Sequence, residues 1–169
     1  MSQKLCLFFP IDAVGHVNAG IGIAQVLISA GYRVIFLISQ SWQGKLLKYN
    51  IEEYVLPTAQ DQVLSGSDAA QHWVDLMKKS NAFTGLSPLE RMINVRKNLF
   101  KYEILRLKEL DQTLAELVRD LKPDVILTDQ FVTIPAIVNS GIPWIFWCSP
   151  NPLVFIDDEL TPPGCSGLK

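Results

Sequence analysis

Five short strand-like runs alternate along this chain with segments that have helical spacing, and this alternation restricts the possible folds more than any other feature. The runs cover residues 4–9, 33–38, 51–56, 124–128 and 142–147. Strands that alternate with helices usually pair in parallel, because each helical crossover carries the chain back before the next strand begins. The pattern therefore predicts an α/β fold with a doubly wound, Rossmann-like parallel sheet flanked by helices.

Apolar spacing and capping residues indicate the helices between these strands. We expect them over residues 17–30, 41–49, 69–80 and 131–139. The first is apolar nearly all round, which predicts a deeply buried helix. Ser87-Pro88-Leu89-Glu90 is a capping-box start for a long amphipathic helix, in one or two pieces, that stops before Pro123. Its apolar stripe comprises Leu89, Ile93, Phe100, Ile104, Leu107, Leu110, Leu114, Leu117 and Leu121.

Length and composition favour one domain. The chain has 169 residues, of which 49% are hydrophobic, enough for one sizeable core but not for two complete domains. We expect a Rossmann-like domain over residues 1–150. Residues 151–169 are rich in Pro and Gly, which argues against a regular core element and predicts a tail.

Charge and cysteine content indicate a small-molecule partner and a reducing environment. The formal net charge is -2 and Lys and Arg are scattered, so neither a nucleic-acid surface nor a polybasic membrane patch is indicated. Three cysteines, an odd number, fit reduced thiols better than a disulfide framework. No apolar run reaches the length of a signal-peptide core or of a membrane span. We therefore expect a cytoplasmic protein.

A histidine and an aspartate follow two different predicted strands. Gly15-His16 lies where the first strand passes into the first helix, and Asp129 follows the fourth strand. In the commonest doubly wound order these strands are neighbours at the switch point, outside which ligands bind. A carboxylate that accepts from one imidazole nitrogen fixes the tautomer and leaves the other nitrogen free to take a proton. The pair predicts a general base, with Gly15 and Val17 at a helix start that attracts phosphate.

Structural interpretations stay open for each of these residues taken singly. His16 could simply cap the helix and Asp129 could simply shape a turn, and it is their joint placement that favours a site. His72 is interpreted as a helix-surface or packing residue. Two histidines and isolated cysteines form no zinc pattern, and neither G-x-G-x-x-G nor a Walker lysine motif is present. We therefore expect no metal and no dinucleotide cofactor.

Five ordered motifs together span most of the chain. They are Phe8-Phe-Pro-Ile-Asp-Ala-Val-Gly15-His16-Val-Asn18, Gly31-Tyr-Arg-Val-Ile-Phe36, Pro123-Asp-Val-Ile-Leu-Thr-Asp129-Gln-Phe131, Gly141-Ile-Pro-Trp144 and Pro162-Pro-Gly-Cys-Ser-Gly-Leu168. The set resembles the amino-terminal half of UDP-dependent glycosyltransferases, and the last motif is similar to the arthropod branch. The resemblance implies the first half of a GT-B architecture, in which this half binds the acceptor and a second half binds most of the UDP-sugar.

The resemblance also implies a reaction and its residues. His16 matches the catalytic base and Asp129 its dyad partner, in an inverting transfer of a hexose from a UDP-sugar co-substrate to a hydroxyl of a small lipophilic acceptor, as in detoxification. Residues near the base or after the predicted fifth strand are candidate acceptor contacts; they are Asp12, Ala13, Val14, Phe131, Trp147, Ser149 and Asn151.

Two departures and two rival hypotheses accompany the resemblance. Ala19 stands where many relatives carry proline, and this difference can alter the start of the helix without removing the base. The resemblance leads us to expect that this chain lacks the half that would hold uracil, ribose and most of the diphosphate, and that it is an incomplete domain with little activity alone. One rival is non-catalytic sequestration of lipophilic molecules. The other is a glycolipid-synthesising enzyme with a Gly-Gly-His loop, against which the single Gly15 argues.

Overall fold

A five-stranded parallel sheet forms the centre of the computed structural model, which describes residues 3–57, 69–132 and 134–150. The strands are β1 (Leu5–Phe9), β2 (Arg33–Ile38), β3 (Glu52–Val55), β4 (Val125–Thr128) and β5 (Trp144–Phe146). They lie in the order β3-β2-β1-β4-β5, with every neighbouring pair parallel. The predicted α/β fold is confirmed, and so is the adjacency of the first and fourth strands.

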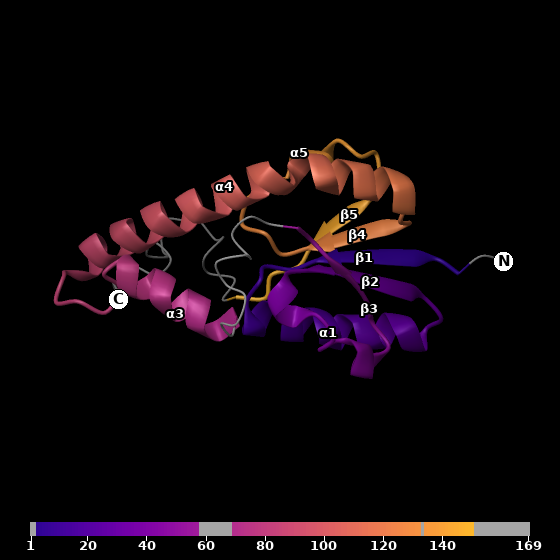
Figure 1. The fold of residues 1–169 in the computed structure, drawn as a ribbon, viewed down its shortest axis with the longest axis horizontal. Coiled ribbons are helices and arrows are strands. Elements are labelled where there is room, and N and C mark those ends of the chain that lie inside the picture. Colours follow the sequence, from indigo (N-terminus) through magenta and orange to yellow (C-terminus); the bar gives the residue numbers. More distant parts are fainter. Residues whose placement is uncertain (1–2, 58–68, 133, 151–169) are drawn as a thin grey trace, which may run out of the picture.

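Helices cover both faces of this sheet (Figure 1). The helices are α1 (Val14–Ser29), α3 (Ala69–Lys79), α4 (Pro88–Leu121) and α5 (Pro135–Val138), with two 3-10 turns, η1 (Gln40–Trp42) and η2 (Leu47–Tyr49). α1 lies against one face, while α4 and α5 lie against the other. The layers are those of a doubly wound domain.

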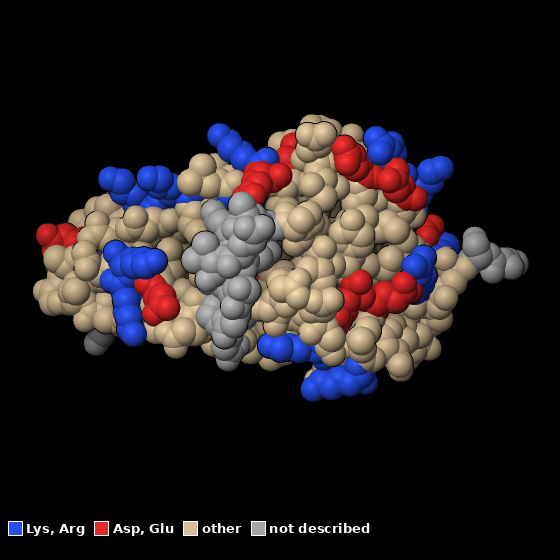
Figure 2. All heavy atoms as spheres, in the orientation of Figure 1, with Lys and Arg blue, Asp and Glu red and all other residues tan. Residues whose placement is uncertain are grey.

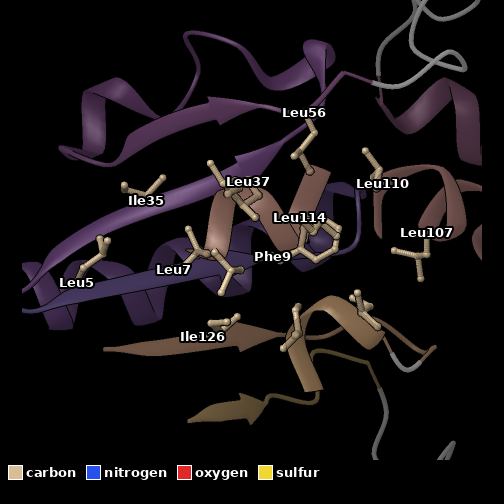
Figure 3. Packing of buried hydrophobic residues seen from close by; sticks show 14 residues of the cluster. Leu5, Leu7, Phe9, Ile35, Leu37, Leu56, Leu107, Leu110, Leu114 and Ile126 are labelled. Carbon is tan, nitrogen blue, oxygen red and sulfur yellow. The ribbon is translucent and has the colours of Figure 1, made fainter. Parts of the chain in front are cut away.

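Alternation along β1 divides the core in two. Leu5, Leu7 and Phe9 face α4, and Figure 3 shows them packed with Leu110 and Leu114. The residues between them point to the other face and pack with Val17, Ile21 and Ala24 of α1. Because successive strand side chains point to opposite faces, an entirely apolar strand is stable only when both faces are covered.

α4 is one continuous helix, and only its second half belongs to the core. Ser87 and Glu90 form the predicted capping box, and no break follows before Leu121. A helix of 34 residues is about 50 Å long, far longer than these strands, so its first half projects beyond the sheet (Figure 1). The predicted apolar stripe is accordingly buried from Leu107 to Leu117 but 58% exposed at Leu89 and 52% at Ile93.

Three other expectations about helices are wrong in detail. α1 begins at Val14 instead of residue 17, and only one side of it meets the sheet, so that Val26 is 70% exposed. The helix expected over residues 41–49 is replaced by η1 and η2. The helix expected over residues 131–139 is reduced to α5, because Pro135 lacks an N–H and fits only the first helical position.

On the face shown in Figure 2, basic and acidic side chains are interspersed. Within residues 3–57, 69–132 and 134–150, no helix combines the length and apolar character needed to cross a bilayer. The tail predicted over residues 151–169, together with Cys165, lies outside these ranges.

Truncating a side chain to alanine should affect the free energy of unfolding differently in the two halves of α4. Leu114→Ala should lower the free energy of unfolding by about 2–5 kcal/mol, because Leu114 is fully buried and its loss leaves a cavity. Ile93→Ala, on the projecting half, is the matched control and should change it by less than about 0.5 kcal/mol. Urea denaturation followed by circular dichroism measures both, and equal losses would contradict this division of the helix.

Candidate active site

His16 and Asp129 are hydrogen-bonded in the structure. His16 Nδ1 lies 2.6 Å from Asp129 Oδ2, although 113 residues separate them in the sequence. The parallel pairing of Phe9 with Thr128 brings the ends of β1 and β4 together, and each residue follows one of these strands. His16 sits in the first turn of α1, where the early helix start at Val14 places it.

Asp129 is completely buried, and three donors surround its carboxylate. Oδ1 accepts from the Ile11 amide at 2.7 Å, while Oδ2 faces both His16 Nδ1 and the Ser149 hydroxyl, which is 2.7 Å away. A buried carboxylate is tolerated when several donors satisfy it. Because an ionised carboxylate can only accept, the Nδ1 of His16 carries the proton and donates it.

His16 remains accessible on its other side. Its side chain is 18% exposed, and no residue that the structure describes donates to Nε2. The rings of His16 and Phe131 lie nearly perpendicular to each other, with ring centroids 5.8 Å apart and planes 77° apart. With Nδ1 occupied by the carboxylate, Nε2 presents a lone pair that can accept a proton.

The loop that joins β1 to α1, and so leads to His16, is fixed by residues not predicted for the site. Gln130 Nε2 donates to the Pro10 carbonyl at 2.8 Å, and Gln130 Oε1 accepts from Arg106 Nη2 at 3.0 Å. Arg106 in turn pairs with Glu103 at 2.9 Å, and all three side chains are buried. A sequence signal did exist, since Glu103 and Arg106 are charged residues spaced three apart within the buried stripe of α4.

Two indoles hold the same loop from other elements. Trp42 Nε1 donates to Asp12 Oδ1 at 2.7 Å, and Trp73 Nε1 of α3 donates to the Asp12 carbonyl at 2.6 Å. Asp12, predicted as an acceptor contact, therefore also ties η1 and α3 to the end of β1. Nothing in the spacing of Trp42 and Trp73 along the chain pointed to this role.

The remaining predicted residues differ in their surroundings. Ala13 caps α1 and Val14 is 40% exposed in its first turn, both close in sequence to the base. Gly15 is exposed, with nothing within 4 Å of a Cβ built on it, whereas Val17 is a core residue whose amide donates to the Ala13 carbonyl. Asn151 lies outside the described residues.

Trp147 packs partly into the core instead of lying free in the site. Its ring is tilted against Phe8 at 5.7 Å, and a Cβ built on Gly20 would lie 3.5 Å from it. A Cβ at Gly20 would also lie 3.2 Å from the ring of Phe36, so glycine provides the space for both aromatics. Burial leaves the Trp147 Nε1 without a hydrogen-bond partner among the described residues.

The other histidine and Cys6 have structural surroundings. His72 lies between α3 and α4, with its ring 5.0 Å from that of Tyr102, and burial lowers the pKa of its imidazole. Burial, aided by the charge of Asp124, raises the pKa of the Cys6 thiol. Within the parts of the chain that the structure describes, no group of three or more His, Cys, Asp or Glu side chains could hold a metal ion.

An apolar pocket of about 240 Å³ adjoins the histidine through Phe131. It lies between α5 and the edge strand β5, and its lining residues are Thr128, Gln130, Phe131, Val132, Ile134, Ile137, Val138, Trp144 and Phe146. A largely apolar lining with a few polar groups is typical of sites for small lipophilic molecules.

Comparison with known proteins establishes the fold. No protein-family model and no curated protein matches the chain. Among solved structures, the glycotransferase of kitacinnamycin matches with a TM-score of 0.56 and 16% identity, over 88% of this chain and 31% of that one. TcCGT1 in complex with UDP matches with a TM-score of 0.54 and 14% identity, over 91% and 30%. The fold is the Rossmann-like amino-terminal half of a GT-B architecture, and the chain spans about a third of the length of these two structures.

The buried carboxylate predicts a specific tautomer of His16. In the neutral imidazole, Nδ1 should carry the proton and Nε2 should be bare, whereas Asp129→Asn should shift the ring toward the Nε2–H form, because the amide is uncharged. Nitrogen-15 NMR shifts of the two ring nitrogens distinguish these states, with His72 as the internal reference. A wild-type His16 that carries its proton on Nε2 would contradict the assignment.

Proposed function

We propose that this chain is the acceptor-binding half of a UDP-dependent glycosyltransferase, with His16 as its general base and Asp129 as the partner of His16. The 2.6 Å contact between His16 Nδ1 and Asp129 Oδ2 at the carboxyl edge of the sheet carries the proposal. The GT-B fold is consistent with it. Acceptor binding by this half and the individual site residues are part of the proposal.

The proposed reaction follows from what the imidazole can do. An acceptor hydroxyl bound against Nε2 gives its proton to that nitrogen, and Asp129 stabilises the imidazolium through Nδ1. The acceptor oxygen forms a bond to the anomeric carbon of the sugar while the bond from that carbon to the UDP oxygen breaks. UDP leaves with the bonding electron pair. Attack on the face opposite UDP inverts the configuration of the sugar.

The apolar pocket supports a lipophilic acceptor. Phe131 lines this pocket and its ring also lies beside that of His16, so a ligand that extends past Phe131 is proposed to reach the base. Ligand sites combine apolar walls with a few placed polar groups, and the partly exposed imidazole of His16, on the other side of Phe131, is proposed as such a group. The proposed acceptors are small lipophilic molecules that carry a hydroxyl, such as phenols, sterols and xenobiotics.

The UDP-sugar is the proposed co-substrate, and a second half of the enzyme is proposed to hold most of it. The chain spans only about a third of the matched structures, one of which is a complex with UDP. The first turn of α1 leaves amides without helical partners, and Gly15 opens space beside them. These features support a place for the diphosphate near Gly15, whereas Val17, with its amide occupied, contributes only as packing.

Sequestration of lipophilic molecules is the second candidate function. The observation that favours it is the same pocket of about 240 Å³, which requires no donor to bind an apolar ligand. On this hypothesis the His16–Asp129 pair has no catalytic role.

Turnover by a base variant separates these candidates. In the protein that joins this chain to a donor-binding half, His16→Ala should lower sugar transfer by roughly 10²–10⁴-fold, the usual contribution of a general base. His72→Asn, a change at the packing histidine, is the control and should retain activity. Product formation is followed by mass spectrometry, and proton NMR of the product should show an inverted anomeric centre.

The chain of 169 residues supplies the complementary measurement. Calorimetry with lipophilic phenols should show binding, and UDP-sugar added to the same mixture should give little product. Undiminished transfer by His16→Ala in the joined protein would refute the base assignment. Sugar transfer by the 169-residue chain itself would refute sequestration.

A further inference from the structure

We propose that Ser149 is a positioning residue for the His16–Asp129 pair. Its hydroxyl holds the imidazole and the carboxylate in a fixed orientation relative to each other. Its kinetic consequence rests on the proposed function, whereas its effect on the histidine itself does not. The sequence predicts Ser149 only as an acceptor contact.

Three polar atoms form a closed triangle in this site. His16 Nδ1 lies 2.6 Å from Asp129 Oδ2, and the Ser149 Oγ lies 2.7 Å from each of those two atoms. The carboxylate is completely buried and can only accept, so the serine O–H donates to Asp129 Oδ2. The Nδ1–H of His16 then makes a bifurcated hydrogen bond, which both Asp129 Oδ2 and the serine oxygen accept. Each member of the triangle contacts both others.

The backbone holds Ser149 in this position through β5. Thr128 pairs with Phe146, and the Trp147 amide then donates to the Thr128 carbonyl at 3.0 Å, which extends the β4–β5 ladder beyond the strand. Trp147 also packs against Phe8, so the segment is anchored on β1. Ser149 therefore reaches the site from a third strand, and three adjacent strands contribute one residue each.

The hydroxyl of Ser149 has no proton left to donate to a glycosyl acceptor. A serine has one proton to donate, and here it is directed at the carboxylate. The geometry therefore points to an interaction with the base apparatus and not with the substrate. Hydrogen bonds to charged groups are stronger than neutral ones, so this contact stabilises the orientation of Asp129 and, through it, of His16.

Removal of the Ser149 hydroxyl should weaken the site but leave the hydrogen bond between His16 and Asp129 in place. Ser149→Ala leaves Asp129 with the Ile11 amide and His16 as donors, but Oδ2 loses one of its two partners. Water can then reach the Nδ1–H more easily. Ser149→Thr keeps a hydroxyl on the same carbon and should restore the contact.

The first measurement is the exchange of the His16 Nδ1 proton with water, by NMR of the 169-residue chain. Ser149→Ala should accelerate this exchange roughly ten- to hundred-fold, as expected for loss of one hydrogen bond to a charged group. Ser149→Thr should return it to within a few-fold of wild type. Ser140→Ala is the control, because the Ser140 hydroxyl bonds to the Ile137 carbonyl, away from the pair.

The second measurement is steady-state transfer by the protein joined to its donor-binding half. A positioning role predicts that Ser149→Ala lowers kcat by roughly tenfold or more with little change in KM for the acceptor, and that threonine rescues it. An acceptor contact predicts instead a raised KM with kcat preserved, which would overturn the proposal. Ser149→Cys, of similar size and with a weaker donor, should give an intermediate exchange rate if the alanine variant does not fold.

The two measurements fail in distinguishable ways. If Nδ1 exchange accelerates in Ser149→Ala but no protein transfers sugar, positioning stands and the proposed function is wrong. If transfer occurs and Ser149→Ala changes neither exchange nor kcat, the proposed function stands and positioning is wrong.

Discussion

The parallel pairing of β1 with β4 is the constraint on which the rest of this molecule depends. It brings together two chain segments more than a hundred residues apart, and it aligns Phe9 with Thr128, so that both strands end at the same level. A one-residue slip would turn the side chains of β4 to the opposite faces of the sheet. The helices on both faces favour this register, because β1 and β4 are apolar on each side.

The buried carboxylate of Asp129, which follows β4, is the centre of the candidate site. A carboxylate removed from water is stable only with donors around it, and the chain supplies them from three places: the loop after β1, the first turn of α1 and the segment after β5. The same loop is fixed from the opposite side by Gln130 and from two further elements by Trp42 and Trp73. A histidine in such surroundings is preorganised, since its orientation is determined before any ligand binds.

Residues whose position follows from the sheet were predictable from the sequence. The strands have recognisable patterns, the commonest doubly wound order makes β1 and β4 neighbours, and residues after adjacent strands must meet, which led to His16 and Asp129. Contacts that depend on the packing of α4 or on the length of the β4–β5 ladder were not specified by the sequence, although the charges of Glu103 and Arg106 within the apolar stripe of α4 gave a signal of a buried polar pair. Gln130 depends on Arg106 of α4, and the role of Ser149 depends on how far the β4–β5 ladder continues. Helix starts were predicted wrongly where no side-chain cap marks them, as at Val14. The first half of α4 shows that apolar spacing predicts an apolar helix face but not whether other residues cover that face.

His16 is proposed to remove a proton from the acceptor, and the most direct test of this role compares acceptors that need a base with one that does not. In the protein joined to its donor-binding half, transfer to an aliphatic hydroxyl and transfer to a nitrophenol already ionised at the assay pH are measured for wild type and His16→Ala. A general base predicts that the variant loses hydroxyl transfer by roughly a hundredfold or more while transfer to the phenolate is largely kept. Equal losses for both acceptors would contradict the account, because they would show that His16 acts on the structure of the site and not on the proton.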